Sequence, residues 1–234
     1  MGTIKENIFN IRKEIEYTAK NCGRNPEDIK LIAVTKTVDS EKVEEAIETA
    51  GIDCAGENKP QELVKKYEVL GDRLQWHLIG TLQKNKVKYI IDKATMIHSL
   101  DKISLAEEIQ KRAESIDRVM DCLVQVNISG EESKHGTTPE EAAELIKWVS
   151  ENCENIRIKG LMTMAPFDAS EDEIRGIFRG LKDLSVKIDE MKLKNVEMKE
   201  FSMGMTNDYK IAIEEGATMI RVGTAIFGKR NYNK

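Results

Sequence analysis

Residues 30–51, KLIAVTKTVDSEKVEEAIETAG, decide the fold because they hold a complete strand followed by a complete helix. Residues 31–34 are apolar and rich in β-branched side chains, which is typical of a strand buried in a parallel sheet. Asp39 or Ser40 caps the helix that follows, and Gly51 ends it. A strand followed directly by a helix is the repeating unit of α/β proteins.

The same alternation continues along the chain. We expect eight strands, at residues 30–35, 52–55, 74–78, 95–99, 119–127, 156–162, 200–202 and 219–222. The helices between them are clearest at residues 101–113, 138–151, 170–188 and 207–215. A further helix opens the chain, with Thr3 and Glu6 as its capping box and one isoleucine stripe from Ile4 to Ile15.

This pattern predicts parallel strands with helices outside them. At 234 residues, the economical arrangement is a single (β/α)8 TIM barrel with an additional N-terminal helix, since such barrels need about 250 residues. We therefore expect one domain over residues 1–234. The alternative is an open doubly wound sheet, which would need a glycine-rich turn after its first strand. Residues 35–38, TKTV, contain no glycine.

Composition excludes several classes of protein. The net charge of −5 argues against a nucleic-acid binder. No apolar run approaches the length of a membrane span. The four cysteines are widely separated and no two histidines have metal-ligand spacing, so we expect a reduced cytoplasmic protein without a metal site.

Lys36, at the end of the first strand, is the first candidate for chemistry. Residues at the carboxyl ends of barrel strands point into the site. Partial burial lowers the pKa of a lysine, and the free amine then forms a Schiff base with an aldehyde. The alternative is a lysine whose ammonium simply reaches solvent.

The last two strands are followed by a candidate anion site. Ser202, Gly204 and Thr206 precede a helix start, and Gly223 and Thr224 follow the final strand. Barrels often bind phosphate with these two loops, through backbone N–H groups and hydroxyls. A lysine for an aldehyde and a cradle for a phosphate together match pyridoxal 5′-phosphate (PLP), which carries both groups.

Two further residues have more than one interpretation. Arg221 is placed to point inward at the pyridine nitrogen, where a permanent cation would keep that nitrogen unprotonated. It is otherwise a structural ion-pair partner inside the barrel. His77 lies among apolar residues, so it is either near the site or a hydrogen-bonded core histidine.

Several segments resemble one family, the pyridoxal phosphate homeostasis proteins. They are AVTKT at 33–37, GEN at 56–58, WHLIGTLQKNK at 76–86, GLMTM at 160–164, FSMGMTND at 201–208 and RVGTAIFG at 221–228. The resemblance implies a barrel like the N-terminal domain of alanine racemase, with PLP held as a Schiff base on Lys36. It also implies a set of cofactor-binding residues, namely Asn58, His77, Ser202, Met203, Gly204, Thr206, Arg221, Gly223 and Thr224.

The resemblance implies a carrier rather than an enzyme. Such a protein buffers PLP and delivers it to apo PLP-dependent enzymes, and we expect a monomer that contacts neither nucleic acid nor membrane. Some relatives have a second lysine two positions after the first, where this chain has Val38, and an aromatic residue or arginine where it has Lys59. Lys134 is then the candidate for an auxiliary amine.

Two enzymatic alternatives stay open at this point. The first is a PLP-dependent racemase-like enzyme of low activity. Racemases with this barrel carry an extra β-domain that supplies a catalytic tyrosine, for which 234 residues leave no room. The second is a barrel enzyme acting on a phosphorylated sugar, which needs carboxylates at strand ends. Glu57 is the one clear candidate for that role.

Overall fold

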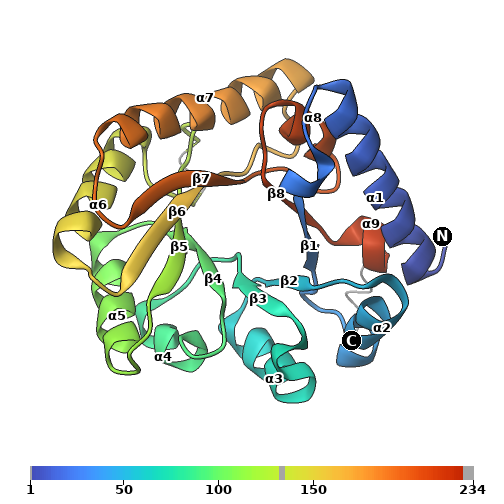
Figure 1. Ribbon diagram of the computed structural model, residues 1–234, viewed down its shortest axis with the longest axis horizontal. Coiled ribbons are helices and arrows are strands. Elements are labelled where there is room, and N and C mark those ends of the chain that lie inside the picture. Colours follow the sequence, from blue (N-terminus) through green and yellow to red (C-terminus); the bar gives the residue numbers. More distant parts are fainter. Residues whose placement is uncertain (1, 132–134, 229–234) are drawn as a thin grey trace.

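The computed structural model describes residues 2–131 and 135–228 as a closed barrel of parallel strands (Figure 1). The strands are β1 (Lys30–Val34), β2 (Cys54–Glu57), β3 (Gln75–Leu78), β4 (Met96–Leu100), β5 (Met120–Gln125), β6 (Ile156–Met162), β7 (Val196–Ser202) and β8 (Met219–Val222). They follow chain order around the ring, and β1 pairs with β8 to close it. The predicted barrel is confirmed, and the open sheet is excluded.

Helices surround the barrel on the outside. They are α1 (Ile4–Asn21), α2 (Ser40–Ala50), α3 (Pro60–Leu70), α4 (Val87–Ile90), α5 (Ile103–Glu114), α6 (Pro139–Asn152), α7 (Glu171–Glu190), α8 (Tyr209–Glu214) and α9 (Thr224–Phe227). Helix α9, which follows β8, is only one turn long. The additional helix α1 packs against α2, α8 and α9 and covers the seam between β8 and β1 (Figure 1).

Local sequence signals account for most element boundaries. The expected capping box at Thr3 is formed, and two more are formed at Thr138 and Ser170, where α6 and α7 begin. Strands β6 and β8 have the predicted bounds, whereas β2 lies two residues later than expected and β7 begins four residues earlier. The end of β2 gives no strand signal in the sequence because Ala55 and Gly56 are small. The first half of β7 gives a weak one because it is only partly buried and alternates with charged residues.

The strands separate two packed regions. The larger lies between strands and helices, and the smaller fills the lower barrel interior with Ile32, Cys54, Met96, Leu123, Met162 and Met219. Successive strand residues point to opposite faces. On each strand, every second residue after the interior one also points inward, and the last of these side chains reach the carboxyl end of the barrel. This two-residue step leads to Lys36, Asn58, Gln125, Met164 and Gly223.

Candidate functional site

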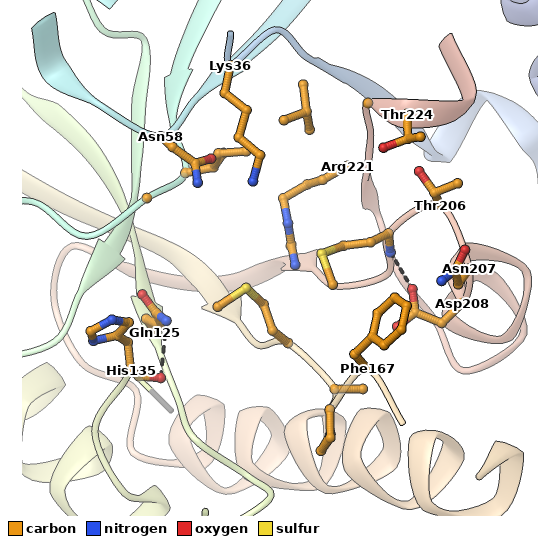
Figure 2. Close-up of a pocket in the computed structure, with 18 of the residues that line it drawn as sticks. Lys36, Asn58, Gln125, His135, Phe167, Thr206, Asn207, Asp208, Arg221 and Thr224 are labelled. Atoms are coloured by element: carbon orange, nitrogen blue, oxygen red, sulfur yellow. Dashed lines mark hydrogen bonds between the residues drawn. The ribbon is translucent and has the colours of Figure 1, made fainter. Parts of the chain in front are cut away.

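A cavity of about 620 Å³ opens at the carboxyl end of the strands. The residues reached by the two-residue step all line it, and loops after β3, β6, β7 and β8 complete its wall. Figure 2 shows the Lys36 amine and the Arg221 guanidinium both directed into the cavity. Two cationic side chains in one concave site favour a ligand that carries negative charge.

Lys36 lies in a tight turn that begins directly after β1. The Val38 N–H donates to the Thr35 carbonyl at 2.9 Å, which closes the turn. Thr37 takes a φ of +63°, a conformation that β-branched residues rarely adopt. In this turn the half-buried Lys36 side chain points into the cavity and not toward the surrounding helices.

Arg221 faces Lys36 from β8 and is only 4% exposed. Its guanidinium donates to Ser202 Oγ at 2.5 Å and to the Thr163 carbonyl at 3.0 Å. Burial lowers the pKa of Arg221 to about 10, so the side chain stays charged at neutral pH. The two bonds fix the plane of the guanidinium, and the group is held as a donor beneath the cavity.

A buried chain of polar groups continues below Arg221. Ser202 Oγ lies 2.9 Å from His98 Nδ1, and His98 Nε2 lies 2.8 Å from His77 Nδ1. Burial lowers the pKa of His77 to about 3 and that of His98 well below its ordinary value, so both rings are neutral. Because Arg221 only donates, the consistent assignment has Ser202 donating to His98 and His98 donating to His77. His77 Nε2 then holds a proton that meets no partner among the described residues.

Only the second half of the loop between β7 and α8, from Met205 onward, lines the cavity. The Met203 N–H donates to the Met219 carbonyl, and the Gly204 carbonyl accepts from the Arg221 N–H. Gly204 has a φ of +90°, and a Cβ there would lie 2.5 Å from Ala212 Cβ, so it permits α8 to pack closely. The cavity receives Met205, Thr206 and the residues after them.

The second half of this loop is held by Asp208, which is 7% exposed. Its carboxylate accepts from the Met205 N–H, while its own N–H donates back to the Met205 carbonyl at 3.2 Å. Burial raises the pKa of Asp208, although Arg221 and the Met205 bond oppose this. Asp208 is the N-cap residue of α8, but its side chain stabilises the preceding loop instead of the helix.

Thr206 and Thr224 present hydroxyls on one side of the cavity, across from Asn58 (Figure 2). Thr224 begins α9, and the first N–H groups of a helix have no partner within it. Asn58 lines the cavity beside the loop after β3, which passes unusually close to it. A Cβ on Gly80 would lie 2.3 Å from the Asn58 carbonyl oxygen, so only glycine fits there.

Six of the ten residues expected at the site line the cavity, namely Lys36, Asn58, Thr206, Arg221, Gly223 and Thr224. The other four, His77, Ser202, Met203 and Gly204, are buried and do not line it. Ser202 and His77 instead belong to the chain below Arg221. Ser202 points into the barrel but lies level with Met162 and Met219, and Arg221 lies between its hydroxyl and the cavity.

Other sequence interpretations are corrected by the structure. Glu57 does not face the cavity; it is fully buried on the outer side of β2, with Lys66 as its ion-pair partner. The histidines at 77 and 98 looked unrelated in sequence, yet adjacent strands bring them into contact. Across residues 2–131 and 135–228, no cluster of three or more potential metal ligands is present. Lys134 lies outside the described residues.

Sequence reasoning also missed residues that line the cavity. Gln125 lies inside an apolar run and gives no separate signal, but its amide donates to the His135 carbonyl and its side chain borders the cavity. Phe167 lies at the rim and is 86% exposed. Gln125 could have been found from the alternation along the strand, because it lies two residues after the interior residue Leu123. Nothing in the sequence marks Phe167. Within the described parts of the chain, no helix combines the length and apolarity that a membrane span requires.

Comparison with known proteins agrees with this geometry. The family model of the alanine racemase N-terminal domain matches residues 7–231. A pyridoxal phosphate homeostasis protein of Aquifex aeolicus is 43% identical over 229 residues, covering 97% of this chain and 98% of that protein. PipY of Synechococcus elongatus, solved with PLP bound, is 30% identical with a TM-score of 0.84, covering 97% of this chain and all of that one.

The fold extends to more distant proteins. An alanine racemase of Clostridium difficile is 18% identical with a TM-score of 0.74, and the match covers 97% of this chain but 58% of the racemase. At this identity the likeness concerns the barrel alone. The full-length matches at higher identity are decisive, and the chain belongs to the family of pyridoxal phosphate homeostasis proteins, whose barrel is that of the alanine racemase N-terminal domain.

Proposed function

We propose that this protein binds PLP in the barrel cavity and acts in PLP homeostasis, buffering the cofactor and delivering it to apo-enzymes. In this proposal Lys36 holds the aldehyde as a Schiff base. The observation that carries it is the convergence of Lys36 and Arg221 on one cavity that also presents the Thr206 and Thr224 hydroxyls. The names of the relatives and the PLP bound to PipY support the same ligand.

The donor set suits the two ends of this ligand. Thr206, Gly223 and Thr224 offer hydroxyl and backbone donors to a phosphate, next to the start of α9. Lys36 lies across the cavity from Thr206 and Thr224, with Asn58 at its side (Figure 2). Arg221 lines the cavity between these two groups and would face the aromatic ring of the cofactor.

Arg221 is central to the expectation that the protein is a carrier. When bound, PLP supplies a ring that withdraws electrons from an attached amine, most strongly when its nitrogen is protonated. Arg221 is a cation that only donates hydrogen bonds, so it would accept none from a protonated ring nitrogen and would disfavour protonation there. Tyr209, at the start of α8 next to the loop after β7, is buried and donates to Glu14. These features support a non-catalytic role over a racemase-like one.

The remaining parts of the proposal concern the cellular setting. We propose apo PLP-dependent enzymes as recipients, a monomeric protein and a cytoplasmic location. Nucleic acid and membrane are not among the proposed partners.

Absorption spectroscopy with chemical trapping tests the central claim. The purified protein, supplied with PLP, should acquire a visible absorption band and lose it on borohydride reduction. Peptide mass mapping should then find the reduced cofactor on Lys36, and Lys36→Ala should remain unlabelled. A label on another lysine, or a protein that takes up no PLP, would contradict the proposal.

A further inference from the structure

The turn that carries Lys36 is held from outside the barrel by side chains of α3 and β2. Lys66 Nζ donates to the Thr35 carbonyl at 2.6 Å, and the Glu62 carboxylate accepts from the Thr37 N–H at 2.8 Å. These two contacts flank Lys36 on either side. Neither side chain lines the cavity.

The spacing along α3 makes this possible. Glu62 and Lys66 are four residues apart, so they share one face of the helix. Glu57, the last residue of β2, points to the same face and completes the set. Its Oε1 accepts from Lys66 Nζ at 2.5 Å and from Thr35 Oγ1 at 2.6 Å. We name Glu57, Glu62 and Lys66 the α3 brace.

Burying the charged groups of the α3 brace costs free energy. Lys66 is 5% exposed and Glu57 is fully buried, with its Oε2 unpartnered among the described residues. Burial raises the pKa of Glu57 even with Lys66 beside it. Buried ion pairs of this kind seldom add stability over an apolar pair of similar volume. A role other than stability therefore accounts better for its presence.

That other role is to hold the turn that carries Lys36. Thr37 has positive φ, a conformation that is strained in a β-branched residue and persists only where its surroundings enforce it. The bond from the Thr37 N–H to Glu62 acts on this residue directly. The bond from Lys66 fixes the peptide unit immediately before Lys36. Both ends of the Lys36 backbone are thus determined by α3.

We propose that Glu62 and Lys66 are positioning residues that aim the Lys36 amine into the cavity. This inference rests on the proposed function, since the amine must meet the aldehyde of PLP. A misplaced amine leaves the contacts to phosphate and ring intact and weakens only the covalent link. The brace therefore contributes to the retention of ligands that bond to Lys36, and to no others.

Two ligands and three variants at exposed or half-exposed positions test this. PLP bonds to Lys36, whereas pyridoxamine 5′-phosphate has the same ring and phosphate but no aldehyde. Glu62→Ala should weaken PLP binding about tenfold, the factor expected for one lost hydrogen bond to a charged group. Its affinity for pyridoxamine 5′-phosphate should not change. Glu62→Gln keeps an acceptor oxygen and should bind both ligands as the wild type does, as should Glu68→Ala on the exposed face of α3.

The buried half of the brace needs a double variant, because Lys66→Met alone would leave Glu57 uncompensated and risk misfolding. Glu57→Gln/Lys66→Met removes both charges and keeps an acceptor for the Thr35 hydroxyl. It should fold and show the same selective loss of PLP. Equal losses for both ligands, or no loss in either variant, would overturn the positioning role.

A readout without cofactor separates this inference from the proposed function. Amide hydrogen exchange at residues 36–38 of the PLP-free protein should be faster in Glu62→Ala than in Glu68→Ala. Failure of the wild type to take up PLP would refute the proposed function and the positioning role with it. Wild-type uptake with unchanged exchange and unchanged PLP affinity in Glu62→Ala would refute the positioning role alone.

Discussion

At the residue scale, the direction of each side chain follows from a simple alternation. On β8, Met219 points into the barrel and Ile220 points out to the helices, so Arg221 points in again. The next inward position is Gly223, at the cavity wall. Charge and polarity therefore increase along the interior toward the carboxyl ends of the strands, and the polar groups that a ligand needs are gathered there.

Thr224→Val tests the phosphate end of the proposed site. Valine keeps the shape of threonine and removes the hydroxyl, so PLP binding should weaken by about 1–3 kcal/mol. Pyridoxal, which lacks the phosphate, should bind the variant and the wild type equally. Titrations followed by absorbance give both affinities. An equal loss for the two aldehydes would mean that the hydroxyl only supports the fold.

The buried histidines predict a pH dependence of stability. The pKa of His77 is about 3 in the folded protein, against about 6.5 when unfolded. Below pH 6.5 the unfolded chain therefore binds a proton that the folded chain refuses. The free energy of unfolding should fall as pH decreases from 6.5 toward 3, by up to about 1.4 kcal/mol per pH unit for each such group.

Urea unfolding of the PLP-free protein between pH 7.5 and 5 measures this effect. His77→Gln should give a flatter dependence on pH than the wild type, because one of the two buried rings is gone. His135→Gln, which alters an exposed histidine, should follow the wild type. Identical slopes in all three proteins would show that His77 does not contribute.

At the scale of elements, one close contact controls the loop after β7. Gly204→Ala adds a methyl group against Ala212 and forces alanine into positive φ. The variant should lose at least about 1–3 kcal/mol of stability and displace α8 together with the loop that carries Thr206. Gly176→Ala, on the exposed side of α7 with open space around it, should instead gain about 0.5–1 kcal/mol. Thermal unfolding compares the two, and a Gly204→Ala variant as stable as the wild type would contradict the argument.

Elements with strong local signals were predictable from the sequence, and those set by their neighbours were not. The caps at Thr3, Thr138 and Ser170 satisfy N–H groups within their own helices, so sequence alone locates them. Helix α3 was not among the helices named from the sequence, although Pro60 opens it, because its buried face carries Lys66 between Leu63 and Leu70 and this charge interrupts the apolar stripe. The contact between His77 and His98 depends on the register of β3 with β4, which no local pattern encodes.

At the scale of the whole molecule, the closed ring makes each strand depend on both of its neighbours. We propose that residues 1–234 form a single domain, in which helix α1 covers the seam that the one-turn α9 leaves exposed. The cavity opens at one end of this ring, and Phe167 stands exposed at its rim. An open cavity excludes water poorly, which disfavours efficient chemistry on a bound amino acid.

Proton exchange distinguishes a carrier from an enzyme. The PLP-loaded protein, incubated in deuterated water with single L-amino acids, should exchange the α-proton far more slowly than about 1 per second, an ordinary enzymatic rate. Nuclear magnetic resonance follows the loss of the proton signal. Transfer of PLP to an apo-enzyme in the same solution without such exchange would agree with a carrier. Exchange or racemisation at an enzymatic rate would favour the racemase-like alternative.

The pairing of β1 with β8 has a kinetic meaning. Lys36 follows β1 and Arg221 lies on β8, where it pairs with Ile32 of β1. The two groups proposed to hold PLP therefore meet only after the first and last strands of the chain have found each other. Contacts between such distant segments form slowly because a long loop must close first. A ligand that spans the junction binds only the completed ring, so it shifts the equilibrium toward the state in which β1 and β8 are paired.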